Sequence, residues 1–205
     1  MTLARVFCAA RNYADHAVEM GHDGHAEPFF FMKPEAALFR GDRMTYPVDT
    51  VDLHHEVELV VALARGGANI AVADALGHVA GYGVGVDLTK RDRQAELQAK
   101  GHPWERAKAF ENSAPISAIH PVSDVGHPSA AAIRLSVNGA IRQQGNTNQM
   151  IWKTADLIAN LSRIWTLAEG DLIYTGTPAG VGPLVRGDKV LAEVEGVAKL
   201  AFSVV

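Results

Sequence analysis

The clearest alternation of hydrophobic and polar positions lies between residues 53 and 63, in the run LHHEVELVVAL. Successive side chains of a strand point to opposite faces, so the apolar residues at the odd positions of 57–61 share one face. Glu56 and Glu58 then lie side by side on the other face, where two carboxylates repel unless a positive charge separates them. The pattern fits a solvent-exposed strand face, the commoner case, or a pair of oxygen ligands for a hard cation such as Mg²⁺ or Mn²⁺.

The rest of the pattern predicts short strands separated by turns, with two or three helices among them. Strands are expected at 5–10, at 29–34 up to a proline, at 81–87, at 172–175 and twice within 189–205, with a hairpin over 133–143 that turns at Asn138-Gly139. Helices are expected at 72–79, at 89–100 before Gly101, and at 154–164 with Thr154 as the N-cap, and a Gly- and Pro-rich loop at 176–183. No internal repeat or linker divides the chain. We therefore expect one domain over residues 1–205, of a mixed, β-rich α+β class.

Composition narrows the range of functions. The 205 residues are 48% hydrophobic and 20% charged, as in ordinary soluble globular proteins. The formal net charge of −4 and the lack of a Lys/Arg run argue against nucleic acid as a partner. No apolar run is long enough to span a membrane, and Arg5 and Arg11 interrupt the first apolar stretch, so we expect a cytoplasmic protein without a signal peptide. Cys8, the only cysteine, is expected to be buried and inert.

Three carboxylates are candidate metal ligands. Glu56 and Glu58 are joined by Asp87, which ends the glycine-interrupted strand at 81–87. Three protein oxygens leave open positions on an octahedral Mg²⁺ or Mn²⁺, where substrate or water can bind. The chain has no H-E-x-x-H motif and no cysteine pair for zinc. It also lacks a G-x-S-x-G nucleophile elbow, a dinucleotide-binding fingerprint and a P-loop.

A second candidate pair lies nearer the N-terminus. His16 and Glu19 are three residues apart in a short predicted helix and therefore share a face. A carboxylate beside a histidine can orient the imidazole and set its basicity. The spacing alone fits a catalytic dyad and a surface pair equally well.

Seven collinear motifs resemble those of the fumarylacetoacetate hydrolase family, and they cover nearly the whole chain. They are RNYADH at 11–16, FMKP at 31–34, LHHEVEL at 53–59, DLTKRDRQ at 87–94, KAF at 108–110, VNG at 137–139 and TGTPAGVG at 175–182. Within the family the chain is similar to the compact acylpyruvate hydrolase branch. The runs MGHD at 20–23 and DLIY at 171–174 make it most similar to the bacterial fumarylpyruvate hydrolases.

The resemblance implies a fold, an assembly and a set of roles. The fold would be the family's β-roll, a β-sandwich barrel with short flanking helices, usually in a homodimer. Metal ligands would be Glu56, Glu58 and Asp87; His16, Glu19 and Lys108 would be catalytic; Arg91, Gln94 and Thr177 would bind substrate oxygens. The family usually has glycine where this chain has Ala10, so a positive φ there would strain the turn.

The chemistry that the resemblance implies is hydrolysis of a carbon–carbon bond in 2,4-dioxo acids, in the breakdown of aromatic compounds. Fumarylpyruvate or another acylpyruvate would yield pyruvate and a carboxylic acid. Alternatives that use the same site are decarboxylation or tautomerisation of oxaloacetate, and isomerisation or decarboxylation of 2-hydroxyhepta-2,4-diene-1,7-dioate. A metal-stabilised binding protein without catalysis is the alternative from another class, and it would not need His16, Glu19 and Lys108 together.

Overall fold

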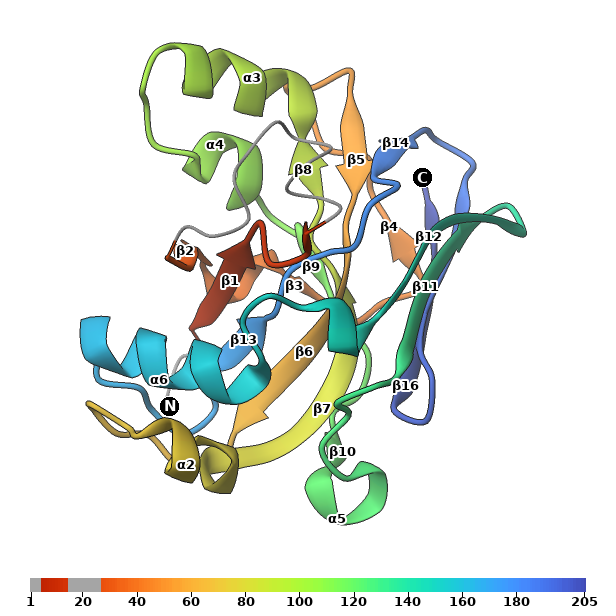
Figure 1. Ribbon diagram of the computed structural model, residues 1–205. Coiled ribbons are helices and arrows are strands. Elements are labelled where there is room, and N and C mark those ends of the chain that lie inside the picture. The colour runs from red at the N-terminus through yellow and green to blue at the C-terminus, as the bar shows by residue number, and fades with distance from the viewer. Residues whose placement is uncertain (1–4, 15–26) are drawn as a thin grey trace.

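Two long antiparallel strands, β6 (Val57–Leu63) and β7 (Val79–Val86), run through the centre of the computed structural model, which describes residues 5–14 and 27–205 (Figure 1). They belong to a six-stranded sheet of order β10-β7-β6-β13-β1-β2. Its other strands are β1 (Val6–Ala10), β2 (Phe29–Lys33), β10 (His120–Pro121) and β13 (Leu172–Tyr174). Neighbours in this sheet are antiparallel except β1 and β13, which are parallel.

A five-stranded sheet packs against β6 and β7 and appears edge-on beside them (Figure 1). Its order is β12 (Ala140–Asn146), β11 (Ala132–Val137), β15 (Lys189–Val194), β16 (Ala198–Val204) and β4 (Arg43–Met44). Smaller sheets are formed by β14 (Gly182–Leu184), β5 (Leu53–His55) and β8 (Thr89–Lys90), and by β3 (Leu38–Phe39) with β9 (Ala114–Pro115). The helices are α2 (Val72–Ala75), α3 (Arg91–Ala99), α4 (Glu105–Lys108), α5 (Val122–Val125) and α6 (Thr154–Ile164), with 3-10 turns η1 (Glu35–Ala37), η2 (Leu76–His78) and η3 (Thr147–Gln149). The expected mixed, β-rich class is confirmed.

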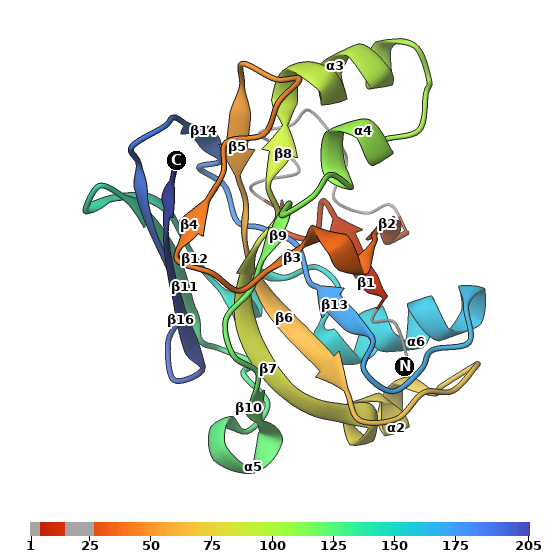
Figure 2. The same cartoon turned by 180° about the vertical axis from the view of Figure 1, so that it is seen from behind.

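The strand β6 is buried on both of its faces. One face contributes Val57, Leu59 and Val61 to the core between the two large sheets. The opposite face contributes Val60 to a second, smaller core, which β3 and β9 cover on the side of the sheet seen in Figure 2. Cys8 lies in that second core, where burial, followed by the negative charge of Asp87, raises the pKa of its thiol well above the usual value. The expectation of a buried, unreactive cysteine fits this environment.

Several local predictions hold, and the exceptions have physical reasons. Asn138 (φ 53°) and Gly139 (φ 82°) form the expected hairpin turn between β11 and β12. The helix α6 has the predicted bounds, but Thr154 is its first residue rather than its cap, and the Asp156 carboxylate accepts a hydrogen bond from the Lys153 N–H at 3.0 Å. The helix α3 begins two residues later than expected, because β8 pairs with β5 instead.

The glycines of β7 lie where neighbouring groups approach closely, since a Cβ added at Gly81 would lie 2.2 Å from the His120 carbonyl oxygen. A Cβ added at Gly85 would lie 2.5 Å from the ring of Tyr174, closer than packed atoms approach. The loop expected at 176–183 is irregular up to Val181 and then enters the short strand β14.

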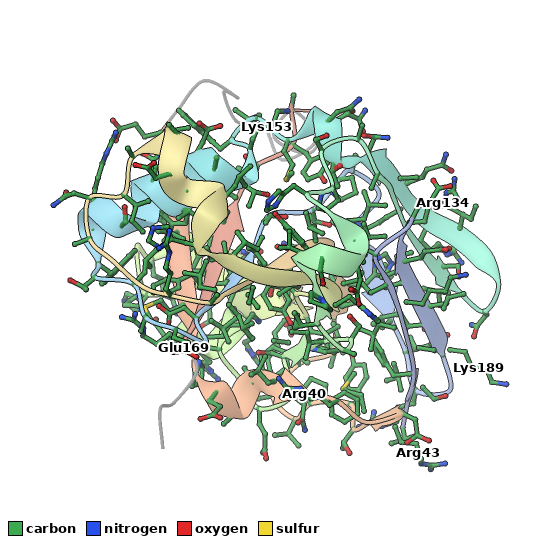
Figure 3. All side chains as sticks on the ribbon, turned by 90° about the horizontal axis from the view of Figure 1, so that it is seen from below. Arg40, Arg43, Arg134, Lys153, Glu169 and Lys189 are labelled. Atoms are coloured by element: carbon green, nitrogen blue, oxygen red, sulfur yellow. The ribbon has the colours of Figure 1, made fainter. Side chains whose placement is uncertain are left out.

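Charged side chains lie mainly at the surface, where Figure 3 shows Arg134, Lys153 and Lys189 around the rim of the molecule. Phe29 in β2 is 46% exposed, so this aromatic strand lies only partly in the core. Among the helices of the described residues, none has the length and apolar character needed to cross a membrane.

Candidate active site

The pairing of β6 with β7 brings three carboxylates together. Glu56 lies between β5 and β6, and its carbonyl accepts a hydrogen bond from the Asp87 N–H at 2.8 Å. Glu58, two residues further along the same face, pairs with Gly85 on β7. One oxygen from each of Glu56, Glu58 and Asp87 lies within 4.8 Å of the others, and the three residues are 6%, 2% and 1% exposed. The interpretation of Glu56 and Glu58 as a solvent-exposed face is therefore wrong, and the predicted ligands converge.

Glu58, only 2% exposed, is the carboxylate that the loop after β13 contacts. Burial, followed by the charges of Asp87 and Glu56, raises its pKa well above the ordinary value of 4.5. The Gly176 N–H donates a hydrogen bond to its Oε2 at 2.7 Å and partly opposes that rise. Gly176 has a φ of 96°, a conformation that favours glycine, so this loop turn places the backbone donor against the Glu58 carboxylate.

Lys108, at the end of α4, lies against the carboxylates, and its predicted contact with substrate stays a prediction. Its Nζ donates to Asp87 Oδ2 at 2.6 Å, to Glu56 Oε2 at 2.9 Å and to Thr89 Oγ1 at 2.6 Å. Burial alone would lower the pKa of Lys108, but the Asp87 and Glu56 carboxylates outweigh it and raise the pKa above its usual value. The Thr89 hydroxyl in turn donates to Glu56 Oε1 at 3.0 Å. Lys108 is therefore a fixed positive charge in the site.

Lys33 is a second buried ammonium beside the carboxylates, and it was not among the predicted site residues. Its Nζ lies 2.8 Å from Asp87 Oδ1, and it donates to the Ser113 carbonyl at 3.1 Å, to Ser113 Oγ at 3.0 Å and to the Lys108 carbonyl. These acceptors use its protons, so Asp87 Oδ1 gains charge attraction but no hydrogen bond among the described residues. The signal in the sequence was a lone lysine at the end of an apolar, aromatic strand.

Arg91 and Gln94, on the first turns of α3, also reach the site. Arg91 Nη2 pairs with Glu56 Oε1 at 2.6 Å, and Nη1 donates to Gln94 Oε1 at 2.5 Å. Both side chains line one cleft with the three carboxylates, Lys108 and Thr177, so the structure brings every described site residue of the prediction together. Other walls of this cleft are Ala9, Ala10, Arg11, Phe31, Gln98 and Trp104.

The structure tests the prediction made for Ala10 but not the one made for His16 and Glu19. The residue with a positive φ is Arg11 (59°) rather than Ala10, which ends β1, so the strain expected at Ala10 does not occur. His16 and Glu19 lie outside the described residues, and their catalytic role stays a prediction.

The residues fit a hard divalent cation. Three buried carboxylates offer oxygen ligands, and one of their oxygens, Asp87 Oδ1, has no hydrogen-bond donor within residues 5–14 and 27–205. Lys33, Lys108 and Arg91 balance the three formal negative charges, so a bound divalent ion leaves the cluster with an excess of about two positive charges. An all-oxygen donor set suits Mg²⁺ or Mn²⁺, the predicted cofactors, better than softer metals.

Known proteins show the same fold. A family model described as "Fumarylacetoacetate (FAA) hydrolase C-terminal" matches residues 5–205. The chain is 45% identical to fumarylpyruvate hydrolase from Pseudomonas aeruginosa, whose crystal structure is a complex with Mn²⁺ and pyruvate. That match has a TM-score of 0.97 and covers 99% of this chain and 90% of that chain.

Relatives that are named for another activity are similar to the chain to nearly the same degree. The chain is 44% identical over 200 residues to the mitochondrial oxaloacetate tautomerase FAHD1 of Mus musculus, covering 97% of this chain and 90% of that protein. It is 43% identical over 196 residues to the oxaloacetate tautomerase YcgM of Escherichia coli (strain K12), covering 95% and 90%. The seven motifs, the fold and these matches agree: the chain belongs to the fumarylacetoacetate hydrolase family and has the mixed β fold of its enzymes.

Proposed function

We propose that residues 1–205 form a single catalytic domain that hydrolyses a carbon–carbon bond of 2,4-dioxo acids such as fumarylpyruvate, within aromatic-compound breakdown. The observation that carries the enolate-forming part of the proposal is the contact of the Lys108 ammonium with two members of the buried carboxylate cluster, at 2.6 and 2.9 Å. Fixed charges in a site shielded from water stabilise an anion that forms during reaction far more than they do in water. The anion in question is the enolate of a 2-oxo acid.

The cofactor in this proposal is Mg²⁺ or Mn²⁺, held by Glu56, Glu58 and Asp87. When bound, it would supply a Lewis acid that polarises the oxygens of a 2-oxo acid. The Mn²⁺ and pyruvate in the structure of the Pseudomonas relative support this choice. The positive excess left by such an ion favours substrates with two carboxylates over those with one.

Three residues of the cleft would hold the substrate. The Arg91 guanidinium already faces the carboxylate of Glu56 at 2.6 Å and retains further N–H donors for a substrate carboxylate. Gln94 fixes the Arg91 side chain through the 2.5 Å hydrogen bond to Nη1. Thr177 adds a hydroxyl to the lining of the same cleft, and Lys108 would approach the oxygen on which enolate charge develops.

Hydrolysis needs a base for water, and we assign this role to His16 with Glu19, on the motif they share with the family. His16 would take a proton from water while the water oxygen bonds to the distal carbonyl carbon of the 2,4-dioxo acid. The carbon–carbon bond then breaks, its electron pair passes into the pyruvate enolate, and a proton returned to that enolate completes pyruvate. A general base of this kind contributes about 10²–10⁴-fold in rate.

Oxaloacetate tautomerisation is the second candidate, and the mouse and E. coli relatives favour it. Oxaloacetate is also a 2-oxo acid with two carboxylates, and its tautomerisation passes through its own 2-oxo acid enolate without attack by water. Decarboxylation of oxaloacetate, and isomerisation or decarboxylation of 2-hydroxyhepta-2,4-diene-1,7-dioate, would use the same charges. Lys108 and the carboxylate cluster therefore serve each reaction, and the water-activating pair separates them.

A direct comparison of substrates tests the proposal. Purified protein with Mg²⁺ or Mn²⁺ is assayed on fumarylpyruvate by pyruvate release, and on oxaloacetate by enol–keto conversion and by loss of carbon dioxide. We expect the highest kcat/KM on fumarylpyruvate, and a loss of activity in Asp87→Asn but not in Glu195→Gln, an exposed position. A preference for oxaloacetate of more than about tenfold, or about 1.4 kcal/mol, would reverse the order of the two candidates.

The substrate is a small molecule in either case. A homodimer and a cytoplasmic location stay predictions, the first from the family resemblance and the second from composition. Light scattering during size-exclusion chromatography tests the dimer.

A further inference from the structure

The Gln143 side chain, fully buried on β12, is hydrogen-bonded at both ends of its amide. Its Oε1 accepts from the Val57 N–H at 3.0 Å, and its Nε2 donates to the Pro178 carbonyl at 2.8 Å. A backbone N–H can only donate and a backbone carbonyl can only accept, so these two partners fix which end of the amide is which. His55 Nδ1, 2.9 Å from Oε1, must then carry a proton and donate as well.

The fixed amide also determines the direction of a hydroxyl in the cleft. Gln143 Nε2 lies 2.8 Å from Thr177 Oγ1 and has only protons to offer, so the Thr177 oxygen accepts. The hydroxyl proton of Thr177 must point elsewhere. Within the described residues it donates to no protein acceptor, although Thr177 is only 3% exposed and lines the cleft with the carboxylates and Lys108.

We propose that Gln143 is a positioning residue that directs the Thr177 hydroxyl proton into the cleft, where it donates to a carboxylate oxygen of the bound 2-oxo acid. The inference rests on the proposed function, because it needs an anionic ligand there. A carboxylate only accepts hydrogen bonds. A Thr177 hydroxyl turned the other way would present a lone pair to that carboxylate and weaken its binding.

A merely structural role for Gln143 makes a different prediction. Gln143 links the start of β6 to the loop at Pro178, so its loss by truncation would loosen the segments that carry Glu56 and Gly176, and metal binding would fall too. Gln143→Glu separates the two roles. An ionised carboxylate of nearly the same shape still accepts from Val57 and His55, but it cannot donate to Thr177 or to the Pro178 carbonyl. The Mn²⁺ affinity, measured separately, therefore reports whether loss of the Pro178 contact loosens the metal site. The Thr177 hydroxyl would then donate to the new carboxylate and present its lone pair to the ligand.

The experiment measures oxalate binding to the Mn²⁺-loaded protein by calorimetry, and Mn²⁺ binding separately. Oxalate imitates the enolate of pyruvate, and binding requires no turnover. The variants are Gln143→Glu, Thr177→Val and both together, with Gln144→Glu as the matched control, since Gln144 is exposed and next in sequence. We expect each single variant to weaken oxalate by about 10- to 100-fold, the loss for one hydrogen bond to a charged group. The double variant should bind oxalate no more weakly than the more affected of the two single variants. The Mn²⁺ affinity of all variants, and the oxalate affinity of the control, should be unchanged.

Each contrary result has its own meaning. Three results would refute the positioning role of Gln143 and leave the proposed function standing. Gln143→Glu could bind oxalate like the wild type, or the losses of oxalate affinity in the two single variants could multiply in the double variant. The Mn²⁺ affinity could also fall in parallel with the oxalate affinity. If the Mn²⁺-loaded wild type binds no oxalate, the proposed function fails first. Gln143→Met, which also cannot donate, replaces Gln143→Glu if that variant does not fold, with the same expected loss.

Discussion

Replacing Lys33 by methionine tests the charge balance of the site. The Lys33 side chain is completely buried, and its ammonium lies 2.8 Å from Asp87 Oδ1 and donates to the Ser113 carbonyl at 3.1 Å. Lys33→Met keeps most of the volume but leaves a buried carboxylate oxygen without its cation and a buried carbonyl without its donor. Breaking one partner of a buried ion pair costs about 3–5 kcal/mol of unfolding free energy. In a chain of this size that is about 6–20 °C in Tm.

Lys199→Met is the matched control. Lys199 also pairs with a carboxylate, Glu193 at 3.1 Å, but its side chain is 67% exposed. A pair so exposed to water contributes about 1 kcal/mol or less, or about 4 °C or less in Tm. Both variants are compared with the wild type by urea unfolding followed by tryptophan fluorescence in EDTA at one pH. Equal losses in the two variants would refute the idea that the buried pair stabilises the site.

Added Mn²⁺ separates the charge of Lys33 from its hydrogen bonds to carbonyl groups. In Lys33→Met the carboxylates face one ammonium fewer, so a bound cation relieves more repulsion than it does in the wild type. We therefore expect a larger Mn²⁺-induced rise in stability for Lys33→Met than for the wild type or Lys199→Met. An identical rise in all three would show that Lys33 acts through its hydrogen bonds alone.

Three further predictions concern substrate, pH and the base. Because the metal-loaded cluster has an excess of positive charge, kcat/KM should be at least about tenfold higher for fumarylpyruvate than for the monocarboxylate acetylpyruvate. Equal kcat/KM values for the two substrates would contradict this charge count. Burial and the neighbouring carboxylates raise the pKa of Glu58, so in EDTA the folded state holds that proton more tightly than the unfolded chain does. The free energy of unfolding should therefore fall as pH rises above about 4.5, while the stabilisation by Mn²⁺ should grow. Urea titrations between about pH 5 and 8, with and without Mn²⁺, check both trends. His16→Ala should lower hydrolysis of fumarylpyruvate by about 10²–10⁴-fold with Mn²⁺ binding intact by calorimetry, whereas near wild-type turnover would remove His16 from the mechanism.

Local patterns were enough to predict those parts of the fold that depend on neighbours in the chain. The turn at Asn138-Gly139 forms because these residues accept positive φ, and α6 forms because its apolar positions recur with the helical period. The start of α3 was missed, since Thr89 and Lys90 pair with a strand more than thirty residues away. Pairing of that kind leaves no mark on the local pattern.

The candidate site shows the same division. The sequence showed residue types that suit a hard cation and an anionic intermediate. They are the acidic pair Glu56 and Glu58 and the motifs around Asp87 and Lys108. The sequence by itself thus determined which chemical groups are available. It could not determine that β6 is covered on both faces, which turned an ordinary surface pattern into a buried cluster.

Only the tertiary structure decided which groups meet, because burial and charge pairing depend on distances between segments remote in sequence. Lys33 reaches Asp87 from β2 of the six-stranded sheet, and Gln143 reaches Thr177 from β12 of the five-stranded sheet. Neither contact has a sequence spacing that predicts it. The antiparallel register of β6 and β7 places Asp87 beside Glu56, whereas a shift of one residue would turn the carboxylates to the other face.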